Sequence, residues 1–196
     1  IFCGVNSAFS EIWWFYPSSS SLENDRYVVW NYTNNLWYYG NLFRTAWLDR
    51  GIKDFPIGAS SDGYLYNHEF GLDDGSTDPA SPISSFIESS QVDIGQGDNF
   101  AFVNRIIPDI SFSTSTVSDP SANVILKSRN FPGGGFQQTD TTGVTQTATT
   151  PVELYTEKAD IRLRGRSMTL RVESNATGVQ WKLGTPRMNI RPDGRR

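Results

Sequence analysis

Three short aromatic runs near the start of the chain constrain its fold more than any other feature. They occupy residues 12–16, 27–32 and 36–39 within the sequence EIWWFYPSSSSLENDRYVVWNYTNNLWYYG. Aromatic and β-branched residues at this density favour strands, because they pack well on a pleated surface. Turn-forming residues separate the runs: proline with serines in the first gap and asparagines in the second. The stretch therefore predicts a three-stranded antiparallel meander.

Apolar residues in these runs stand at consecutive positions, so we expect both faces of the meander to be covered. A small twisted sheet packed between similar neighbours is the blade of a β-propeller. A second, less complete blade is predicted further along, where GYLYNHE (residues 63–69) alternates. Residues 1–70 are therefore interpreted as partial β-propeller blades, with IFCGVNSAF as an edge strand.

The polar sequence GLDDGSTDPASP, residues 71–82, predicts a linker, because it is rich in turn-forming residues. Beyond it the predicted strands are longer and carry fewer aromatic residues. Residues 83–196 are expected to form an antiparallel β-sandwich-like domain, with a long loop over the Gly-, Thr- and Gln-rich residues 130–150. Helix signals are almost absent, so the expected fold class is all-β.

Side-chain alternation changes parity within ADIRLRGRSMTLRVES, residues 159–174. Ile161 and Leu163 share one face, whereas beyond Gly165 the apolar residues fall on the parity of the arginines. Strand side chains alternate strictly, so such a flip requires a β-bulge or a bend. We predict one within one or two residues of Gly165.

Charge is distributed unevenly along the chain, whose formal net charge is −4. Residues 151–196 hold 10 Lys and Arg against 5 Asp and Glu, whereas residues 1–150 hold 7 against 16. This asymmetry indicates a polar interface or an anionic partner, with a solvated arginine surface as the alternative. The residues expected to form the interface are Arg162, Arg164, Arg166, Arg191, Arg195 and Arg196. Carboxylates of a neighbouring subunit or domain are the expected partners, and DNA phosphate is the alternative.

Residues suited to catalysis are few. Cys3 is the only cysteine, which excludes an intrachain disulfide and a thiolate metal site. His68 is the only histidine and is expected to be a structural hydrogen-bonding group. Glu11 and the pair Asp73-Asp74 are the carboxylates that a glycosidase interpretation would nominate, although any two acids can be nominated in this way. We predict no catalytic residue, cofactor or metal ligand, and expect a binding or structural protein rather than an enzyme.

No apolar run approaches the roughly 20 residues that span a bilayer, so stable membrane insertion is not expected.

Several segments of the chain resemble the C-terminal part of tail proteins from short-tailed phages. They are EIWWFYPSSSSLENDRYVVWNY, DGYLYNHEFG, RIIPDISF, RLRGRSMTLRVES and RMNIRPDGRR. The resemblance runs from about residue 11 to residue 196, except for the Thr- and Gln-rich loop. The chain is similar to β-propeller nozzle proteins, also called tail tubular protein B, and to the related packaged-DNA stabilisation proteins. The sequence does not separate these two groups.

This resemblance implies a virion protein of the phage tail, assembled as a homo-oligomeric six-fold ring below the portal and adaptor. The implied partners are the adaptor, the tail fibres and the genomic DNA, which would pass through the lumen during ejection. The family supplies no catalytic residues. Its members are much longer than 196 residues, and this chain begins with Ile. We therefore expect a processed product or the C-terminal piece of a longer protein.

A carbohydrate-binding adhesin or receptor-binding β-propeller is the competing interpretation, and a glycan hydrolase ranks third. Exposed Trp or Tyr surfaces would favour the adhesin, whereas buried aromatic residues favour the structural role. For the structural role we expect Trp13, Trp14, Trp30 and Trp37 to be buried or to lie at subunit contacts.

Overall fold

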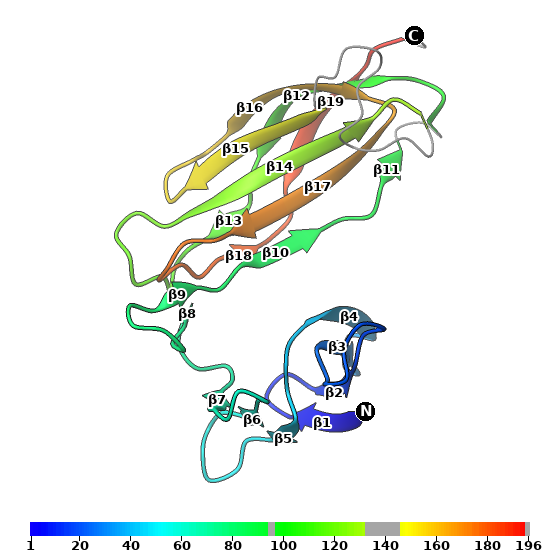
Figure 1. The fold of residues 1–196 in the computed structure, drawn as a ribbon. Coiled ribbons are helices and arrows are strands. Elements are labelled where there is room, and N and C mark those ends of the chain that lie inside the picture. The colour runs from blue at the N-terminus through cyan, green and yellow to red at the C-terminus, as the bar shows by residue number, and fades with distance from the viewer. Residues whose placement is uncertain (94–96, 132–145, 195–196) are drawn as a thin grey trace. The chain divides into compact units, whose positions relative to one another are not determined.

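The computed structural model describes residues 1–93, 97–131 and 146–194 (Figure 1). The predicted all-β class is confirmed: the described residues form several antiparallel sheets, none of which closes into a barrel. Backbone contacts divide the chain into two compact units, Ile1–Gly71 and Leu72–Arg196. The blade arrangement expected for residues 1–70 stays a prediction.

The first unit is built on a four-stranded antiparallel sheet in the order β1-β2-β3-β4. Its strands are β1 (Phe2–Asn6), β2 (Glu11–Tyr16), β3 (Arg26–Asn31) and β4 (Leu36–Asn41). The last three are the predicted meander, which is confirmed. The first reversal is held by Asp25, whose carboxylate accepts hydrogen bonds from the backbone N–H and the hydroxyl of Ser18, both at 2.6 Å. The second contains Asn35 at a φ of 52°, a conformation that asparagine tolerates.

Three shorter strands follow in the same unit and pair antiparallel in the order β5-β6-β7. They are β5 (Ala46–Leu48), β6 (Ile57–Ala59) and β7 (Leu65–Asn67). Trp47 of β5 packs against the buried cluster of Trp13, Phe15 and Val29, and its ring stacks on that of Trp13 at 5.3 Å. Gly4 makes room for this contact, because a Cβ there would lie 2.5 Å from the Trp47 ring.

The second unit consists of two larger antiparallel sheets and two short strand pairs. One sheet has five strands, ordered β10-β17-β14-β15 with β11 also paired to β17, and the other has three, ordered β16-β12-β19. The longer strands are β10 (Ser85–Glu88), β12 (Ala101–Ile107), β14 (Ser121–Arg129), β15 (Thr147–Glu153), β16 (Ala159–Gly165), β17 (Ser167–Ser174) and β19 (Arg187–Pro192). The shorter ones are β8 (Asp73–Asp74), β9 (Ser81–Pro82), β11 (Val92–Asp93), β13 (Ile110–Ser111) and β18 (Lys182–Leu183).

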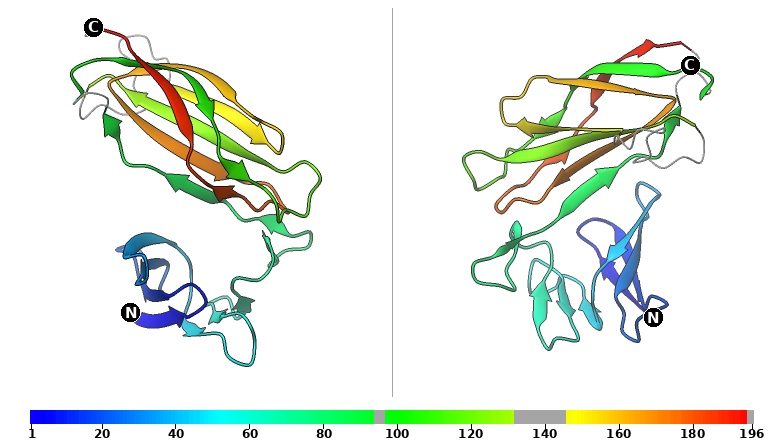
Figure 2. Two further views of the ribbon diagram at one scale, coloured as in Figure 1. Left: turned by 180° about the vertical axis from the view of Figure 1, so that it is seen from behind. Right: turned by 45° about the horizontal axis from the view of Figure 1, so that its top comes forward.

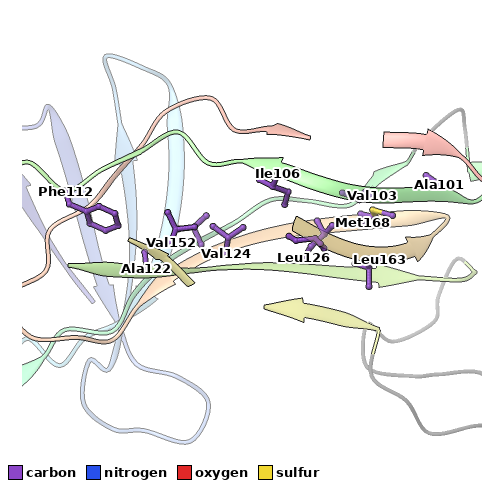
Figure 3. Close-up of a cluster of buried hydrophobic side chains, with 12 residues drawn as sticks. Ala101, Val103, Ile106, Phe112, Ala122, Val124, Leu126, Val152, Leu163 and Met168 are labelled. Carbon is purple, nitrogen blue, oxygen red and sulfur yellow. The ribbon is translucent and has the colours of Figure 1, made fainter. Parts of the chain in front are cut away.

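The two larger sheets share one hydrophobic core (Figure 3). Val103 and Ile106 of β12 lie across from Val124 and Leu126 of β14, and all four are buried. Met168 of β17 joins them from the five-stranded sheet. The unit is therefore two-layered, and its layers can be followed from three sides in Figure 1 and Figure 2.

The predicted break in the alternation at Gly165 is confirmed. β16 ends at Gly165 in one sheet and β17 begins at Ser167 in the other, so the chain crosses between layers at Arg166. The Arg166 N–H donates to the Arg129 carbonyl of β14 at 2.8 Å. A Cβ on Gly165 would lie 2.5 Å from the Cβ of Ser128, so the crossing has no room for a side chain.

The predicted linker, residues 71–82, contains a short hairpin in which β8 pairs with β9. One sequence-based boundary was wrong. The predicted loop over residues 130–150 extends too far, because residues 147–150 already belong to β15 and pair with β14. Threonine is a β-branched residue that suits a strand as well as a loop, which explains the error. Residues 132–145 of that loop lie outside the described residues.

Candidate functional site: an arginine-rich sheet face

Five of the eight arginines that the structure describes in the second unit lie on the outer face of the three-stranded sheet. Alternation in β16 buries Ile161 and Leu163 and exposes Arg162 and Arg164. In β19, Met188 packs against the core, and the adjacent Arg187 and Asn189 are exposed. We call the outward set the arginine face; its members are Arg105, Arg162, Arg164, Arg187 and Arg191.

Backbone register brings these arginines together from distant positions. Phe102 in the central strand pairs with Arg164 on one side and with Arg191 on the other. Each arginine therefore lies about 5 Å from the central strand, within reach of its neighbours.

An irregularity in β12 adds Arg105 to the same face. The register shifts between Val103 and Arg105, so Phe102 and Arg105 can both point outward although three residues separate them. Arg105 then pairs with Asp160 and Asn189 across the two flanking strands.

The arginine face carries more positive than negative charge. Arg164 forms an ion pair with Asp193, and its guanidinium lies 4.0 Å from the centre of the Phe100 ring. Arg105 lies 3.6 Å from the Asp160 carboxylate, with both side chains well exposed. An exposed pair of this kind is worth about 0–1 kcal/mol. Within the described part of the chain Arg162, Arg187 and Arg191 form no ion pair.

A shallow hollow of about 380 Å³ opens on this face. Its lining residues are Arg105, Ile107, Arg187, Met188, Asn189 and Ile190. Two arginines and one asparagine, whose side chains carry N–H donors, are thus among the residues that line an open space. Guanidinium forks match the geometry of carboxylates and phosphates, so the hollow is suited to an anionic oxygen group.

On the five-stranded sheet, in contrast, several charged side chains form ion pairs with one another. Glu88 lies 2.9 Å from Lys127 and 3.0 Å from Arg171, and Arg171 lies 2.6 Å from Glu173. Burial alone would raise the pKa of Glu88, but hydrogen bonds from Lys127 and Arg171 outweigh it and lower the pKa. Lys127 and Arg171 on that sheet are thus paired locally, whereas three members of the arginine face form no ion pair within the described residues.

The structure brings together three of the six predicted interface residues: Arg162, Arg164 and Arg191. The expectation that Arg166 shares a strand face with Arg162 and Arg164 was wrong, because the strand ends at Gly165.

Arg166 instead holds the crossing between the layers. Its Nη1 donates to the carbonyls of Gly97 at 3.1 Å and Asp98 at 2.7 Å, and its guanidinium lies 4.6 Å from the Phe100 ring centre. Arg195 and Arg196 lie outside the described residues. Sequence reasoning missed Arg187, which shares strand parity with Arg191 and was therefore detectable. It also missed Arg105, because side-chain alternation alone does not predict that Arg105 lies on the arginine face.

The carboxylates nominated for glycosidase chemistry are engaged in structural bonds. Glu11 is buried and accepts hydrogen bonds from Trp13 Nε1 at 3.0 Å, from Asn6 Nδ2 at 3.4 Å and from the Tyr38 hydroxyl. Asp73 accepts a hydrogen bond from the backbone N–H of Gly178 at 2.7 Å, which ties the β8–β9 hairpin to the second unit.

His68 has the hydrogen-bonding role expected of it. Its Nε2 accepts a hydrogen bond from Arg44 Nε at 2.8 Å, and its ring lies 4.5 Å from that of Trp47. Burial, with the nearby Arg44 charge, lowers the pKa of His68 to about 4. The ring is therefore neutral at pH 7 and acts as an acceptor.

The four tryptophans of the first sheet divide between its two faces. Trp13 is buried, as expected, whereas Trp37 on the other face is 60% exposed. The Trp37 ring stacks on Trp14 and on Trp30, each at 5.8 Å, and both of these are half-buried. Burial within the chain is thus a wrong expectation for Trp37, and contact with another subunit stays a prediction. We call Trp14, Trp30, Trp37 and Tyr39 the aromatic face.

Comparison with protein-family models and with curated protein sequences finds no match to this chain. Among the residues that the structure describes, no helix is long and apolar enough to cross a membrane.

Proposed function

We propose that this protein is a structural component of a phage tail, part of a ring of identical subunits through which the genome is retained and ejected. The arginine face is the observation that supports it most directly. A ring requires each subunit to offer its neighbour a specific surface. An exposed sheet face with three arginines that form no ion pair within the described residues is such a surface. The resemblance to short-tailed phage nozzle and DNA-stabilisation proteins supplies the tail context.

Protein carboxylates are the partner we assign to the arginine face. Unit charges about 4 Å apart interact by roughly 1 kcal/mol in water and by more where water is excluded. Neighbouring arginines therefore repel one another until an anionic surface neutralises them. Tight phosphate contacts would slow DNA moving through a conduit, because each one adds to a salt-dependent attraction. A subunit contact stabilises the ring without that cost.

The first unit fits the same proposal as a partial β-propeller. One face of its four-stranded sheet covers the core of the unit, while the aromatic face presents large apolar side chains outward. A neighbouring sheet that covers the aromatic face would produce the stacked arrangement of propeller blades.

The proposal is tested by negative-stain electron microscopy of the purified chain at low and at high salt. We expect rings at low salt. Replacing Arg162, Arg187 and Arg191 together with Gln should abolish them, since these three have no ion pair within the described residues. The matched control replaces Arg26, Lys53 and Lys182 with Gln, which removes the same charge from exposed positions elsewhere. Monomers of the unaltered chain in every condition would contradict the proposal.

A glycan-binding adhesin is the second candidate, and the aromatic face is the observation that favours it. Trp37 and Tyr39 are 60% and 83% exposed, and exposed aromatic rings are common sugar-stacking surfaces. Glycan-array binding that is lost in Trp37→Ala, with the thermal stability unchanged, would establish the adhesin. Ring formation without glycan binding would support the structural role.

A further inference from the structure

One segment of the chain contains acidic residues and no lysine or arginine. Residues 54–104 contain 9 Asp and Glu and no Lys or Arg. The members of the arginine face all lie outside this segment, starting with Arg105 itself. Acidic residues thus predominate in this segment, whereas the arginine face contains Arg162, Arg187 and Arg191, which form no ion pair within the described residues.

The β8–β9 hairpin presents the most compact set of acids within this segment. It contains Asp73, Asp74 and Asp78 and no basic residue. Asp73 anchors the hairpin through its bond to the Gly178 N–H at 2.7 Å. Asp74 and Asp78 are exposed, and neither forms an ion pair within the described residues.

The hairpin has a shape that can enter a shallow hollow. Between its two strands stand only small side chains besides Asp78: Gly75, Ser76, Thr77, Pro79 and Ala80. The Thr77 hydroxyl donates to the Pro79 carbonyl at 2.9 Å and lies 2.8 Å from the Ser81 hydroxyl, so the tip is held by its own hydrogen bonds. A narrow, pre-formed tip with a carboxylate loses little conformational freedom on binding.

We propose that the hollow between Arg105 and Arg187 receives the β8–β9 hairpin of a second copy of this chain. The inference rests on the proposed function, because it names the carboxylate partner of the same arginine face. Asp78 at the tip would be held by the two guanidinium groups, and Asp74 would face the remaining arginines. Pairing of two different surfaces repeats from copy to copy, and this is how heterologous contacts build rings.

A charge exchange between two variants tests this contact. The first variant, Arg105→Glu with Arg187→Glu, has an acidic hollow and an unchanged hairpin. The second, Asp74→Arg with Asp78→Arg, has a basic hairpin and an unchanged hollow. Self-association is measured for each by sedimentation velocity at about 50 mM salt, where exposed charges interact over more than 10 Å. Circular dichroism confirms that each variant is folded.

We expect the association constant of each variant alone to fall at least tenfold. Mixing the two should restore association, since the acidic hollow of one then meets the basic hairpin of the other. A control variant, Lys53→Glu with Lys182→Glu, should associate like the unaltered chain, because both lysines are exposed and lie outside the arginine face.

Three results would overturn the inference. Undiminished association of the first variant, or a mixture that stays dissociated, would show that the hairpin is not the partner. Rings that the first variant still forms by electron microscopy would leave the proposed function standing. Binding of duplex DNA by the unaltered chain, lost in the first variant, would assign the hollow to phosphate instead.

Discussion

Replacing Gly165 with alanine tests the account of how the chain crosses between the two layers. The added Cβ would lie 2.5 Å from the Ser128 Cβ and 3.1 Å from the Arg129 carbonyl oxygen. Carbon atoms pack at about 3.5–4.0 Å, so β16 and β14 must move apart by about 1 Å. An extra methyl group in a well-packed core costs about 1–3 kcal/mol.

The upper part of that range is expected here, because the strained region also contains hydrogen bonds. The Ser128 hydroxyl lies 2.9 Å from the Arg164 carbonyl and 3.0 Å from Gln146 Oε1, and the Arg166 N–H donates to Arg129 at 2.8 Å. Separation of the strands weakens these bonds, each worth about 1 kcal/mol. The free energy of unfolding should therefore fall by about 2–3 kcal/mol.

Urea denaturation followed by circular dichroism measures this change. With a slope of about 2 kcal/mol per molar, the midpoint should fall by about 1 M. Gly51→Ala is the matched control, since no atom lies within 4 Å of its added Cβ. The double variant Gly165→Ala with Ser128→Gly removes the closest contact and should regain part of the loss. A midpoint for Gly165→Ala equal to that of Gly51→Ala would refute the packing argument.

Three further predictions concern the first unit. The pKa of His68 is about 4 in the fold against 6.5 for the free side chain, so the unfolded chain takes up the proton first as the pH falls. The contribution of His68 to stability should therefore be lost between about pH 6.5 and pH 4; an NMR titration of this single histidine with a midpoint near 6.5 would contradict it. Phe15→Ala should lower the free energy of unfolding by about 3–5 kcal/mol because Phe15 is fully buried. Tyr39→Ala should change it by less than about 0.5 kcal/mol, and equal urea midpoints for the two variants would contradict the assignment of the buried and exposed faces of this sheet. Tyr38→Phe removes a donor to the buried Glu11 carboxylate and should cost about 1–3 kcal/mol, and an unchanged midpoint would show that the hydroxyl contributes nothing.

Features that depend on neighbouring residues could be predicted from the sequence. The reversal at Asn35 follows from the tolerance of asparagine for a positive φ. The layer crossing at Gly165 follows from side-chain parity, since a strand cannot place both Leu163 and Met168 in a core without a break. Both signals lie within a few positions of the feature that they predict.

The arginine face could be predicted only in part, because its assembly depends on pairing between distant strands. Arg162 and Arg164 alternate within one strand, and their shared orientation is visible in the sequence. Arg105 joins them only through the register shift after Val103, for which the sequence has no local signal. Trp37 illustrates a related limit, since a strand that is aromatic on both faces does not reveal which face the chain itself covers.

The strand order also has a consequence for the timing of folding. In the first unit each strand of the larger sheet pairs with its neighbour in the sequence, so the sheet can form as soon as it is synthesised. In the second unit β12 can pair only after β16 and β19 have been synthesised, and β10 can pair only after β17 has been synthesised. Contacts between distant residues form slowly, and the waiting strands expose unpaired edges that other chains can bind. Synthesis thus allows the four-stranded sheet of the first unit to form while the second unit is incomplete, because β12 has both partner strands only after residue 192 has emerged from the ribosome.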